Sequence, residues 1–256
     1  MSQQNIIEIK NLTVTVIDKV LVDNLSLIIP QETIVALVGG SGSGKTTTGL
    51  SILRLLPLAL KVARGEIFFH GKDLLTVSET QMQKIRGKDV GMVFQDPLMA
   101  FNPVFTIGNQ IEEVLITHTP LSVLKRNQRV LELLDLVGLP DPRRVIKSYP
   151  HQLSGGMRQR AMIAQAIAGD PQLIIADEPT SSLDVTLQAK IMELFRELKN
   201  KLRLSILLIT HDLGMVEHVA DDTAIITEGK IVESGKVSQV FKNPQNGYTK
   251  ELLNTL

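Results

Sequence analysis

The feature that most constrains this chain is a glycine-rich run of eight residues. It reads Gly39, Gly40, Ser41, Gly42, Ser43, Gly44, Lys45 and Thr46, which is a glycine, four residues, and then Gly-Lys-Thr. The preceding Ile34–Val38 is apolar and rich in β-branched residues, which favours a buried strand. The spaced apolar residues of 46–56 predict a helix. Strand, glycine-rich loop and helix in this order are typical of a site for nucleotide phosphates.

The residue types explain how such a loop would work. Glycines let backbone N–H groups converge on a phosphate, and the start of the following helix adds partial positive charge. Lys45 would reach the β- and γ-phosphates, and the Thr46 hydroxyl would ligate Mg²⁺. The alternative is an ordinary Gly/Ser-rich turn, which the flanking strand and helix disfavour. The loop alone does not identify the nucleotide.

Composition excludes several classes. The chain has 256 residues, 27 basic and 27 acidic side chains, and no cysteine. The balanced charge does not indicate a nucleic-acid partner, and disulfides, cysteine zinc sites and iron–sulfur clusters are excluded. The start lacks the blocks of a signal peptide, and the longest apolar stretch, Leu50–Val62, is interrupted by Arg54, Pro57 and Lys61. We therefore expect a soluble, cytoplasmic protein that reaches a membrane only through partners.

The first third of the chain is predicted to be mainly strand. Residues Ile6–Ile29 alternate weakly, which predicts strands with turns at Asp18-Lys19 and Asp23-Asn24. Gly65–Gly71 predicts a short strand between glycines. Residues Thr76–Arg86 predict a helix, with Ser78 or Thr80 as possible N-caps.

The middle of the chain is predicted to be a helical insertion. After a strand at Val90–Phe94, helical spacing covers Ile107–Thr117 and Leu121–Val137, and no strand is expected between Asp96 and Ala168. Strands and helices then alternate again. They are predicted at Leu173–Ala176 (strand), Thr186–Leu202 (helix), Ser205–Ile209 (strand), Met215–Ala220 (helix), and Thr223–Thr227 with Lys230–Glu233 (hairpin).

An acidic pair follows the strand predicted at Leu173–Ala176. Asp177 and Glu178 come directly after four apolar residues, so we expect them at the carboxyl edge of a sheet, where ligands bind in open α/β folds. Asp177 is suited to hold Mg²⁺ through water, and Glu178 to polarise an attacking water as general base. The alternative, a helix cap or a solvated turn, is less favoured because the same chain contains the predicted phosphate loop.

A second anion site is predicted where Ser154-Gly155-Gly156 opens a helix that continues to about Ala168. Alone, this would be a simple capped helix. However, the octet 153–160, Leu-Ser-Gly-Gly-Met-Arg-Gln-Arg, resembles the signature motif of ATP-binding cassette (ABC) ATPases. Further stretches are similar to that family: Gln95 resembles the Q-loop glutamine, Ser181–Asp184 the D-loop, and His211 the switch histidine. The resemblance covers about Ile6 to Leu253.

The resemblance implies an α/β fold. A P-loop NTPase (RecA-like) core would carry an N-terminal antiparallel β subdomain and an inserted α-helical subdomain. All of 1–256 would form one nucleotide-binding domain, with residues 1–95 and 170–256 as the catalytic core and β subdomain. Residues 96–169 would form the helical subdomain with the signature motif.

The resemblance also implies a set of site residues. ATP would bind Gly39–Thr47 and Gln95, with its adenine near Val16, and Mg²⁺ would bind Thr46, Gln95 and Asp177. Lys45, Glu178 and His211 would be catalytic. Ser154, Gly155 and Gly156 of a second ABC ATPase would cover the nucleotide in trans.

The sequence differs from the family pattern at Val16, where the family usually has an aromatic residue that stacks on adenine. Residues 13–18 contain no aromatic side chain. We therefore predict weaker or less base-selective nucleotide binding, since stacking geometry is worth about 0.5–1.5 kcal/mol for an aromatic pair.

The subfamily is indicated by four stretches, which resemble the peptide and nickel importer ATPases, D-type subunits included. They are 96–103, 149–152, 184–189 and 243–249. This resemblance implies an ATPase that drives uptake of dipeptides, oligopeptides, glutathione or nickel. Its partners would be a sister or identical ATPase, two transmembrane permease subunits and, indirectly, an extracytoplasmic substrate-binding protein, without nucleic acid. It would sit peripherally on the cytoplasmic face of the plasma membrane.

Two other classes remain as alternatives. A soluble ABC ATPase acting in DNA repair or on ribosomes commonly has two fused cassettes, coiled coils or zinc modules. This chain has one cassette, no long heptad run and no cysteine. A small-molecule kinase with a phosphate loop would leave the octet at 153–160 and His211 unexplained.

Overall fold

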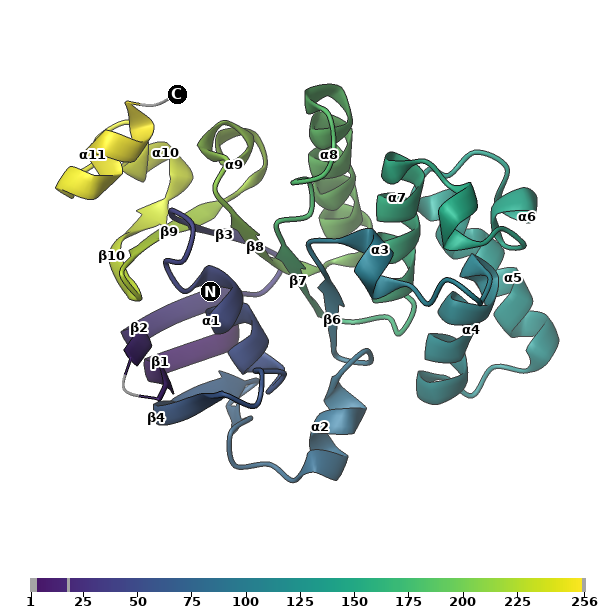
Figure 1. Ribbon diagram of the computed structural model, residues 1–256, viewed down its shortest axis with the longest axis horizontal. Coiled ribbons are helices and arrows are strands. Elements are labelled where there is room, and N and C mark those ends of the chain that lie inside the picture. Colours follow the sequence, from purple (N-terminus) through teal and green to yellow (C-terminus); the bar gives the residue numbers. More distant parts are fainter. Residues whose placement is uncertain (1–3, 18, 255–256) are drawn as a thin grey trace. The chain divides into compact units, whose positions relative to one another are not determined.

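The computed structural model describes residues 4–17 and 19–254. The chain divides into two compact units (Figure 1). The first comprises the chain up to Met82 together with Phe195 onward, and the second comprises Gln83–Leu194. The second unit contains the whole of the predicted helical subdomain, 96–169, and extends beyond it at both ends. The subdomain boundaries at residues 95/96 and 169/170 stay a prediction.

The first unit contains an antiparallel sheet, as predicted. Its strands lie in the order β2-β1-β4-β5, and β1 pairs antiparallel with both β2 and β4. In Figure 1, β1, β2 and β4 lie side by side. The strands are β1 (Asn5–Val16), β2 (Lys19–Pro30), β4 (Leu60–Phe69) and β5 (Lys72–Asp73).

A β-bulge explains why the alternation in β1 looks weak in the sequence. Ile7 and Ile9 are buried at odd positions, whereas Leu12 and Val14 are buried at even positions further along the strand. The pairing register shifts between Ile9 and Leu12, where Asn11 has a φ of 50°. The extra residue turns the rest of the strand over and keeps its apolar side chains on the core face.

The predicted turn at Asp23-Asn24 is wrong, because β2 continues through these residues. Asn24 takes a φ of 51°, and its N–H donates to the Thr13 hydroxyl at 3.2 Å. The strand is therefore kinked and not reversed. The other predicted turn, Asp18-Lys19, involves Asp18, which lies outside the described residues.

A second sheet in the first unit is mainly parallel. Strand β3 (Ile34–Val38) lies between β8 (Ser205–Thr210) and β9 (Asp222–Thr227) and is parallel to both. Every residue of β3 and β8 is buried, which is why both read as continuous apolar runs. Strand β10 (Lys230–Lys236) closes the predicted hairpin with β9, around Glu228 and Gly229 at φ 49° and 77°.

Four helices of the first unit flank these strands. They are α1 (Lys45–Ile52), α9 (Leu213–Val219), α10 (Val237–Val240) and α11 (Gly247–Leu253). The short helices α10 and α11 were not anticipated. A buried cluster that includes Val38 and Ile225 joins the sheet to this end of the chain, and Tyr248 and Leu252 of α11 pack against this cluster.

The second unit is mainly helical and contains one parallel strand pair, β6 (Val90–Val93) with β7 (Leu173–Asp177). As predicted, no strand occurs between residues 96 and 168, all of which are described. The helices there are α3 (Pro97–Ala100), α4 (Ile107–His118), α5 (Val123–Leu136), α6 (Pro142–Val145), a 3₁₀ turn (Pro150–Gln152) and α7 (Gly155–Ala166).

Two helices contain residues of both units, namely α2 (Glu79–Ile85) and α8 (Val185–Leu202). Ser78 caps α2, because its hydroxyl accepts the Gln81 N–H while the Gln81 side chain accepts the Ser78 N–H.

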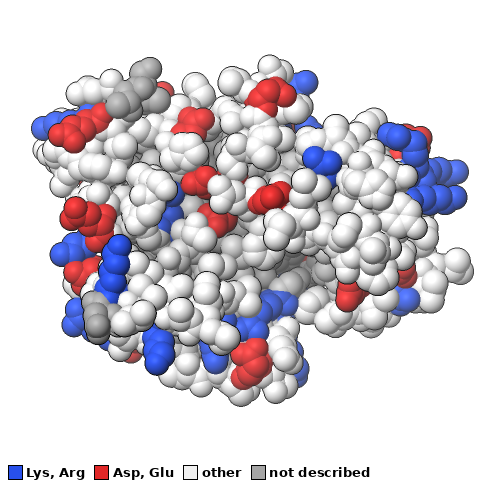
Figure 2. Space-filling view, viewed as in Figure 1, with Lys and Arg blue, Asp and Glu red and all other residues white. Residues whose placement is uncertain are grey.

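Acidic and basic side chains are mixed on the visible face in Figure 2. Across residues 4–17 and 19–254, no helix has the length and apolar character needed to cross a membrane.

A carboxylate fixes the segment before α11 to the second sheet. Glu233 of β10 accepts the backbone N–H groups of Gln245 and Asn246 at 2.8 and 3.1 Å. Burial acts to raise the pKa of Glu233, but the Thr249 side chain, these two backbone hydrogen bonds and the charge of Lys250 outweigh it, so the pKa lies below its ordinary value. The ionised carboxylate therefore stabilises the folded state.

We expect a Glu233→Gln variant to be less stable than wild type at about pH 7 and to approach it at about pH 3. A carboxyl whose folded pKa is depressed adds stability above its unfolded pKa, and this contribution is lost as pH falls through the folded pKa. Urea midpoints at both pH values measure the effect. Glu217→Gln, on the exposed side of α9, is the control; an equal loss for Glu233→Gln at both pH values would contradict the expectation.

Candidate functional site

The glycine-rich loop lies where β3 ends and α1 begins, as predicted. The β3 strand ends at Val38, α1 starts at Lys45, and Gly44 caps the helix at a φ of 103°. A Cβ on Gly39 would lie 2.0 Å from the Ile226 carbonyl oxygen, so only glycine fits there. The loop thus runs against the backbone of β9, and its glycines are required by close approach and by backbone conformation.

Lys45 is buried within this loop, with 5% of its surface exposed. Its ammonium donates to the carbonyl oxygens of Gly39 and Gly40, both at 2.8 Å. The loop backbone therefore curls around the charge. A lysine held in this way keeps a positive charge within the loop.

The hairpin turn between β9 and β10 supports the loop from the other side. The Gly229 N–H donates to the Ser43 carbonyl at 3.0 Å, and the Gly229 carbonyl accepts the Asp23 N–H at 2.9 Å. A Cβ on Gly44 would lie 2.9 Å from the Leu21 carbonyl oxygen. Strand β2, the hairpin turn and the loop are thus packed backbone against backbone, an arrangement that no local pattern in the sequence indicates.

One buried hydroxyl in the loop is left over. Among the described residues, Ser43 Oγ is buried and has no hydrogen-bond partner. Ser41, Gly42 and Thr46 are exposed, while Thr47 is half-buried. A buried hydroxyl without a partner and a buried ammonium in one glycine-rich loop fit a polyphosphate, whose oxygens accept hydrogen bonds from both groups.

His211 lies at the same edge of the sheet as the loop. Strands β3 and β8 are parallel, and Val38 is paired with Thr210, so Gly39 and His211 both follow directly on paired residues. His211 is exposed. Asp212 then caps α9 by accepting the Met215 N–H at 3.0 Å, which fixes where the strand turns into the helix.

The second unit brings Gln95 and Glu178 together. Val93 and Ala176 are paired in the parallel strands β6 and β7, and Gln95 and Glu178 each lie two residues further. Gln95 Nε2 donates to Glu178 Oε2 at 3.2 Å. Glu178 has a φ of 43°, a conformation that costs a residue other than glycine free energy and that clusters at functional sites.

Asp177 precedes Glu178 as the last residue of β7 and is 4% exposed. Mg²⁺ prefers oxygen ligands, and the predicted set, the Thr46 hydroxyl, the Gln95 amide and the Asp177 carboxylate, supplies only oxygen. Within the described part of the chain, no group of three His, Cys, Asp or Glu residues could hold a metal by itself. Thr46 belongs to the first unit, and Gln95 and Asp177 belong to the second, so the set stays a prediction.

The signature octet forms the start of α7, as predicted. Ser154 is the N-cap, and its hydroxyl accepts the Met157 N–H at 3.3 Å. A Cβ on Gly156 would lie 3.2 Å from the Leu187 side chain, so the glycine lets α7 begin close to the start of α8. Asp184 of the predicted D-loop caps α8 by accepting the Leu187 N–H at 3.0 Å.

The predicted site residues thus fall into two groups. The first unit holds Gly39–Thr47, His211 and Val16, and the second holds Gln95, Asp177, Glu178 and Ser154–Gly156. Val16 is half-buried at the end of β1, paired with Lys19 and Leu60. The sequence prediction missed the supporting contacts of Gly229 and Tyr248, because these come from segments far along the chain.

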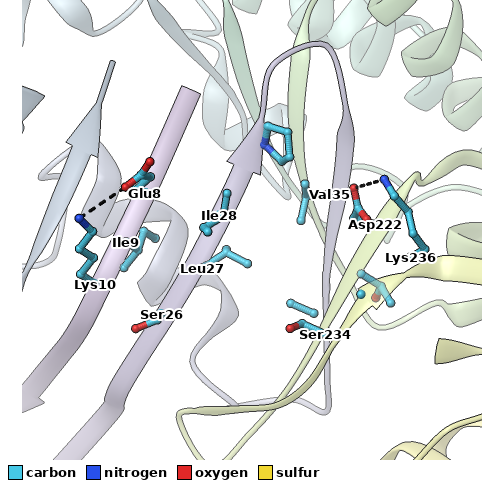
Figure 3. Close-up of a pocket in the computed structure, with 14 residues that line it drawn as sticks. Glu8, Ile9, Lys10, Ser26, Leu27, Ile28, Val35, Asp222, Ser234 and Lys236 are labelled. Carbon is cyan, nitrogen blue, oxygen red and sulfur yellow. Dashed lines mark hydrogen bonds and ion pairs between the residues drawn. The ribbon is translucent and has the colours of Figure 1, made fainter. Parts of the chain in front are cut away.

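A separate cavity of about 470 Å³ lies between the two sheets of the first unit (Figure 3). Its charged residues already pair with one another, Glu8 with Lys10 at 3.5 Å and Asp222 with Lys236 at 2.9 Å. It reaches β3 at Val35, towards the end away from the glycine-rich loop. This cavity is therefore not part of the loop site.

Comparison with known proteins agrees with the motifs. Residues 22–181 match the family model described as ABC transporter. The oligopeptide transport ATP-binding protein OppD of Bacillus subtilis is 50% identical over 85% of this chain and 61% of its own length. The dipeptide transport ATP-binding protein DppD of the same organism is 50% identical over 86% and 66%.

The chain therefore spans about three fifths to two thirds of these two relatives. Among solved structures, the dimeric ATP-binding cassette MJ0796 in a post-hydrolysis state with ADP and Pi is 29% identical. It matches over 90% of this chain and 98% of its own, with a TM-score of 0.80. The predicted P-loop NTPase fold is thereby confirmed, and the chain belongs to the ABC transporter family.

Proposed function

We propose that this chain is the ATP-hydrolysing subunit of an importer that takes up peptides. The observation that supports the proposal is the loop at Gly39–Thr46, in which the buried Lys45 ammonium is held by the backbone of a glycine-rich turn. The names of two relatives, oligopeptide and dipeptide transport ATP-binding proteins, favour peptides as cargo over nickel.

In this proposal the loop binds the phosphates of ATP through its N–H groups and the Ser43 hydroxyl. The Lys45 ammonium, held by the carbonyl oxygens of Gly39 and Gly40, would donate in addition to a negatively charged phosphate oxygen. Mg²⁺, held by Thr46, Gln95 and Asp177, would neutralise charge on the phosphates. Lys45 and His211 would stabilise the charge that develops on the transferred group.

Glu178 is the proposed general base. Its carboxylate would accept a proton from the attacking water, and the Gln95 amide, now 3.2 Å from it, would hold that carboxylate in place. Gln95 is also a proposed Mg²⁺ ligand through its amide oxygen, while its amide nitrogen donates to Glu178, so one side chain would contact both the metal and the base. Gln95 would thus link occupancy of the site to the orientation of the base.

We further propose that the nucleotide is covered by Ser154, Gly155 and Gly156 of a second ATPase, either an identical or a sister chain. The free N–H groups at the start of α7 suit this role. The MJ0796 cassette is dimeric, which supports a paired arrangement. Two permease subunits, and a substrate-binding protein on the other face of the membrane, would complete the importer, placing this chain on the cytoplasmic face.

Val16 leads to a prediction about base selectivity. We expect the dissociation constants for Mg-ATP and Mg-GTP to differ by less than about tenfold, because a valine packs on either base without the stacking preference of an aromatic ring. A Val16→Tyr variant should bind ATP more tightly than wild type. Titration of both nucleotides measures this, and tight wild-type binding with strong ATP preference would contradict it.

The transport proposal is tested by isolating the chain from membranes of its own host with a mild detergent. Two integral membrane proteins should co-purify with it in constant ratio, and Mg-ATP hydrolysis by the purified complex should rise when cargo peptides and the binding protein are added. Co-purification with ribosomes or DNA-repair proteins would instead support the soluble alternative.

A further inference from the structure

The end of the chain contacts the glycine-rich loop directly. The Gly40 N–H donates to the Tyr248 hydroxyl at 3.1 Å, across 208 residues of sequence. Gly40 belongs to the same peptide unit as the Gly39 carbonyl, which accepts the Lys45 ammonium at 2.8 Å. In a trans peptide the N–H and the C=O point in opposite directions. Tyr248 and Lys45 therefore hold the two ends of one peptide unit.

Tyr248 itself is firmly placed. Asn246 accepts the Tyr248 backbone N–H at 2.9 Å and caps α11. The carboxylate of Glu233 holds the two residues before Gly247. The Tyr248 ring packs against the buried cluster that includes Val38, the residue just before the loop. The hydroxyl is thus aimed at Gly40 by the sheet, the helix cap and the core together.

We propose that Tyr248 is a positioning residue for the phosphate loop. By accepting the Gly40 N–H, its hydroxyl fixes the Gly39–Gly40 peptide plane, and the fixed Gly39 carbonyl keeps the Lys45 ammonium within the loop. Without this acceptor the peptide can rotate, and Lys45 loses one of its two carbonyl anchors. The proposal rests on the proposed binding of ATP and adds to it that α11 sets the loop's affinity for polyphosphate.

The test is a Tyr248→Phe variant, which keeps the ring packed against the buried cluster and removes only the hydroxyl that accepts the Gly40 N–H. Loss of one hydrogen bond predicts that the dissociation constants for Mg-ATP and Mg-ADP both rise about three- to tenfold. Both should rise equally because both nucleotides carry the phosphates that the loop binds. In steady-state hydrolysis KM should rise while kcat stays within about twofold, and the thermal midpoint should barely change.

The chain offers a matched control, since it contains only two tyrosines. The other, Tyr149, lies in the second unit and stacks on His151. Tyr149→Phe should leave the nucleotide dissociation constants unchanged. Amide hydrogen exchange of Gly40, followed by NMR without nucleotide, should become faster in Tyr248→Phe and not in Tyr149→Phe.

The possible outcomes separate this inference from the proposed function. If wild type binds Mg-ATP and Tyr248→Phe binds it equally well, Tyr248 does not position the loop. The same conclusion follows if Gly40 exchange is unchanged, or if kcat falls with no change in affinity. If wild type binds no nucleotide at all, the proposed function fails, whereas Gly40 exchange still reports whether the hydroxyl holds the loop.

Discussion

Replacing Glu178 with glutamine is expected to slow ATP hydrolysis at least about 100-fold while leaving ATP binding intact. A glutamine keeps the size of the side chain, and its amide oxygen can still accept the Gln95 hydrogen bond, so the local geometry should persist. It cannot take a proton from water. The loss would therefore fall on the chemical step and not on binding.

Because hydrolysis is what lets two cassettes separate in the proposed mechanism, the Glu178→Gln variant should also accumulate as an ATP-bound dimer. Phosphate release measures the first effect, and size-exclusion chromatography with light scattering in saturating Mg-ATP measures the second. Glu113→Gln, an exposed carboxylate on α4, is the control and should behave as wild type. A variant that hydrolyses ATP at the wild-type rate, or stays monomeric in saturating Mg-ATP, would count against the mechanism.

Placing alanine at Gly39 should abolish nucleotide binding. The added Cβ would lie 2.0 Å from the Ile226 carbonyl and 2.9 Å from Ser43 Oγ, and real Cβ atoms essentially never approach other atoms so closely. The Ile226 carbonyl belongs to the backbone of β9 and cannot easily shift, so the glycine-rich loop must move away from it. Overpacking of this kind costs about 1–3 kcal/mol of stability. We expect the dissociation constant for Mg-ATP to rise more than about 100-fold.

Gly247→Ala is the matched control for this substitution. A Cβ on Gly247 would meet nothing within 4 Å, and the residue begins a helix, where alanine is well tolerated. Urea unfolding and nucleotide titration of the three proteins separate a local change in the loop from general instability. A Gly39→Ala protein with wild-type affinity would show that the approach to Ile226 does not shape the site.

Much of this fold follows from local patterns. The strand before the loop, the helix after it, the acids at the end of β7 and the Ser154 cap each depend on neighbours within a few residues. The helical insertion could likewise be predicted, because periodicity with no strand signal extends over more than 70 residues between Asp96 and Ala168. These features can be predicted without knowing which residues lie next to them in the folded sheet.

Other features depend on contacts that are distant in sequence. The bulge at Asn11 and the kink at Asn24 become visible only when the strands are paired, which is why a turn at Asp23-Asn24 seemed plausible. The support that Gly229 and Tyr248 give to the loop joins segments about 200 residues apart, and short helices such as α11 carry little periodicity. Register and tertiary contact decide these features.

The candidate site shows the same division. Gln95 and Glu178 meet because two parallel strands end together, a geometry that pairing of Val93 with Ala176 explains. Their assignment as one functional set with Lys45 and His211 came from the resemblance to a family, since no spacing in the sequence connects them.

The central claim, that the glycine-rich loop binds the polyphosphate of a nucleotide, is tested most directly by calorimetric titration of the Glu178→Gln protein with ATP in the presence of Mg²⁺. This account predicts saturable binding of one ATP per chain, lost when Gly39→Ala is added. A folded protein that takes up no ATP at millimolar concentration, or that binds it equally well with Gly39→Ala, would contradict the account.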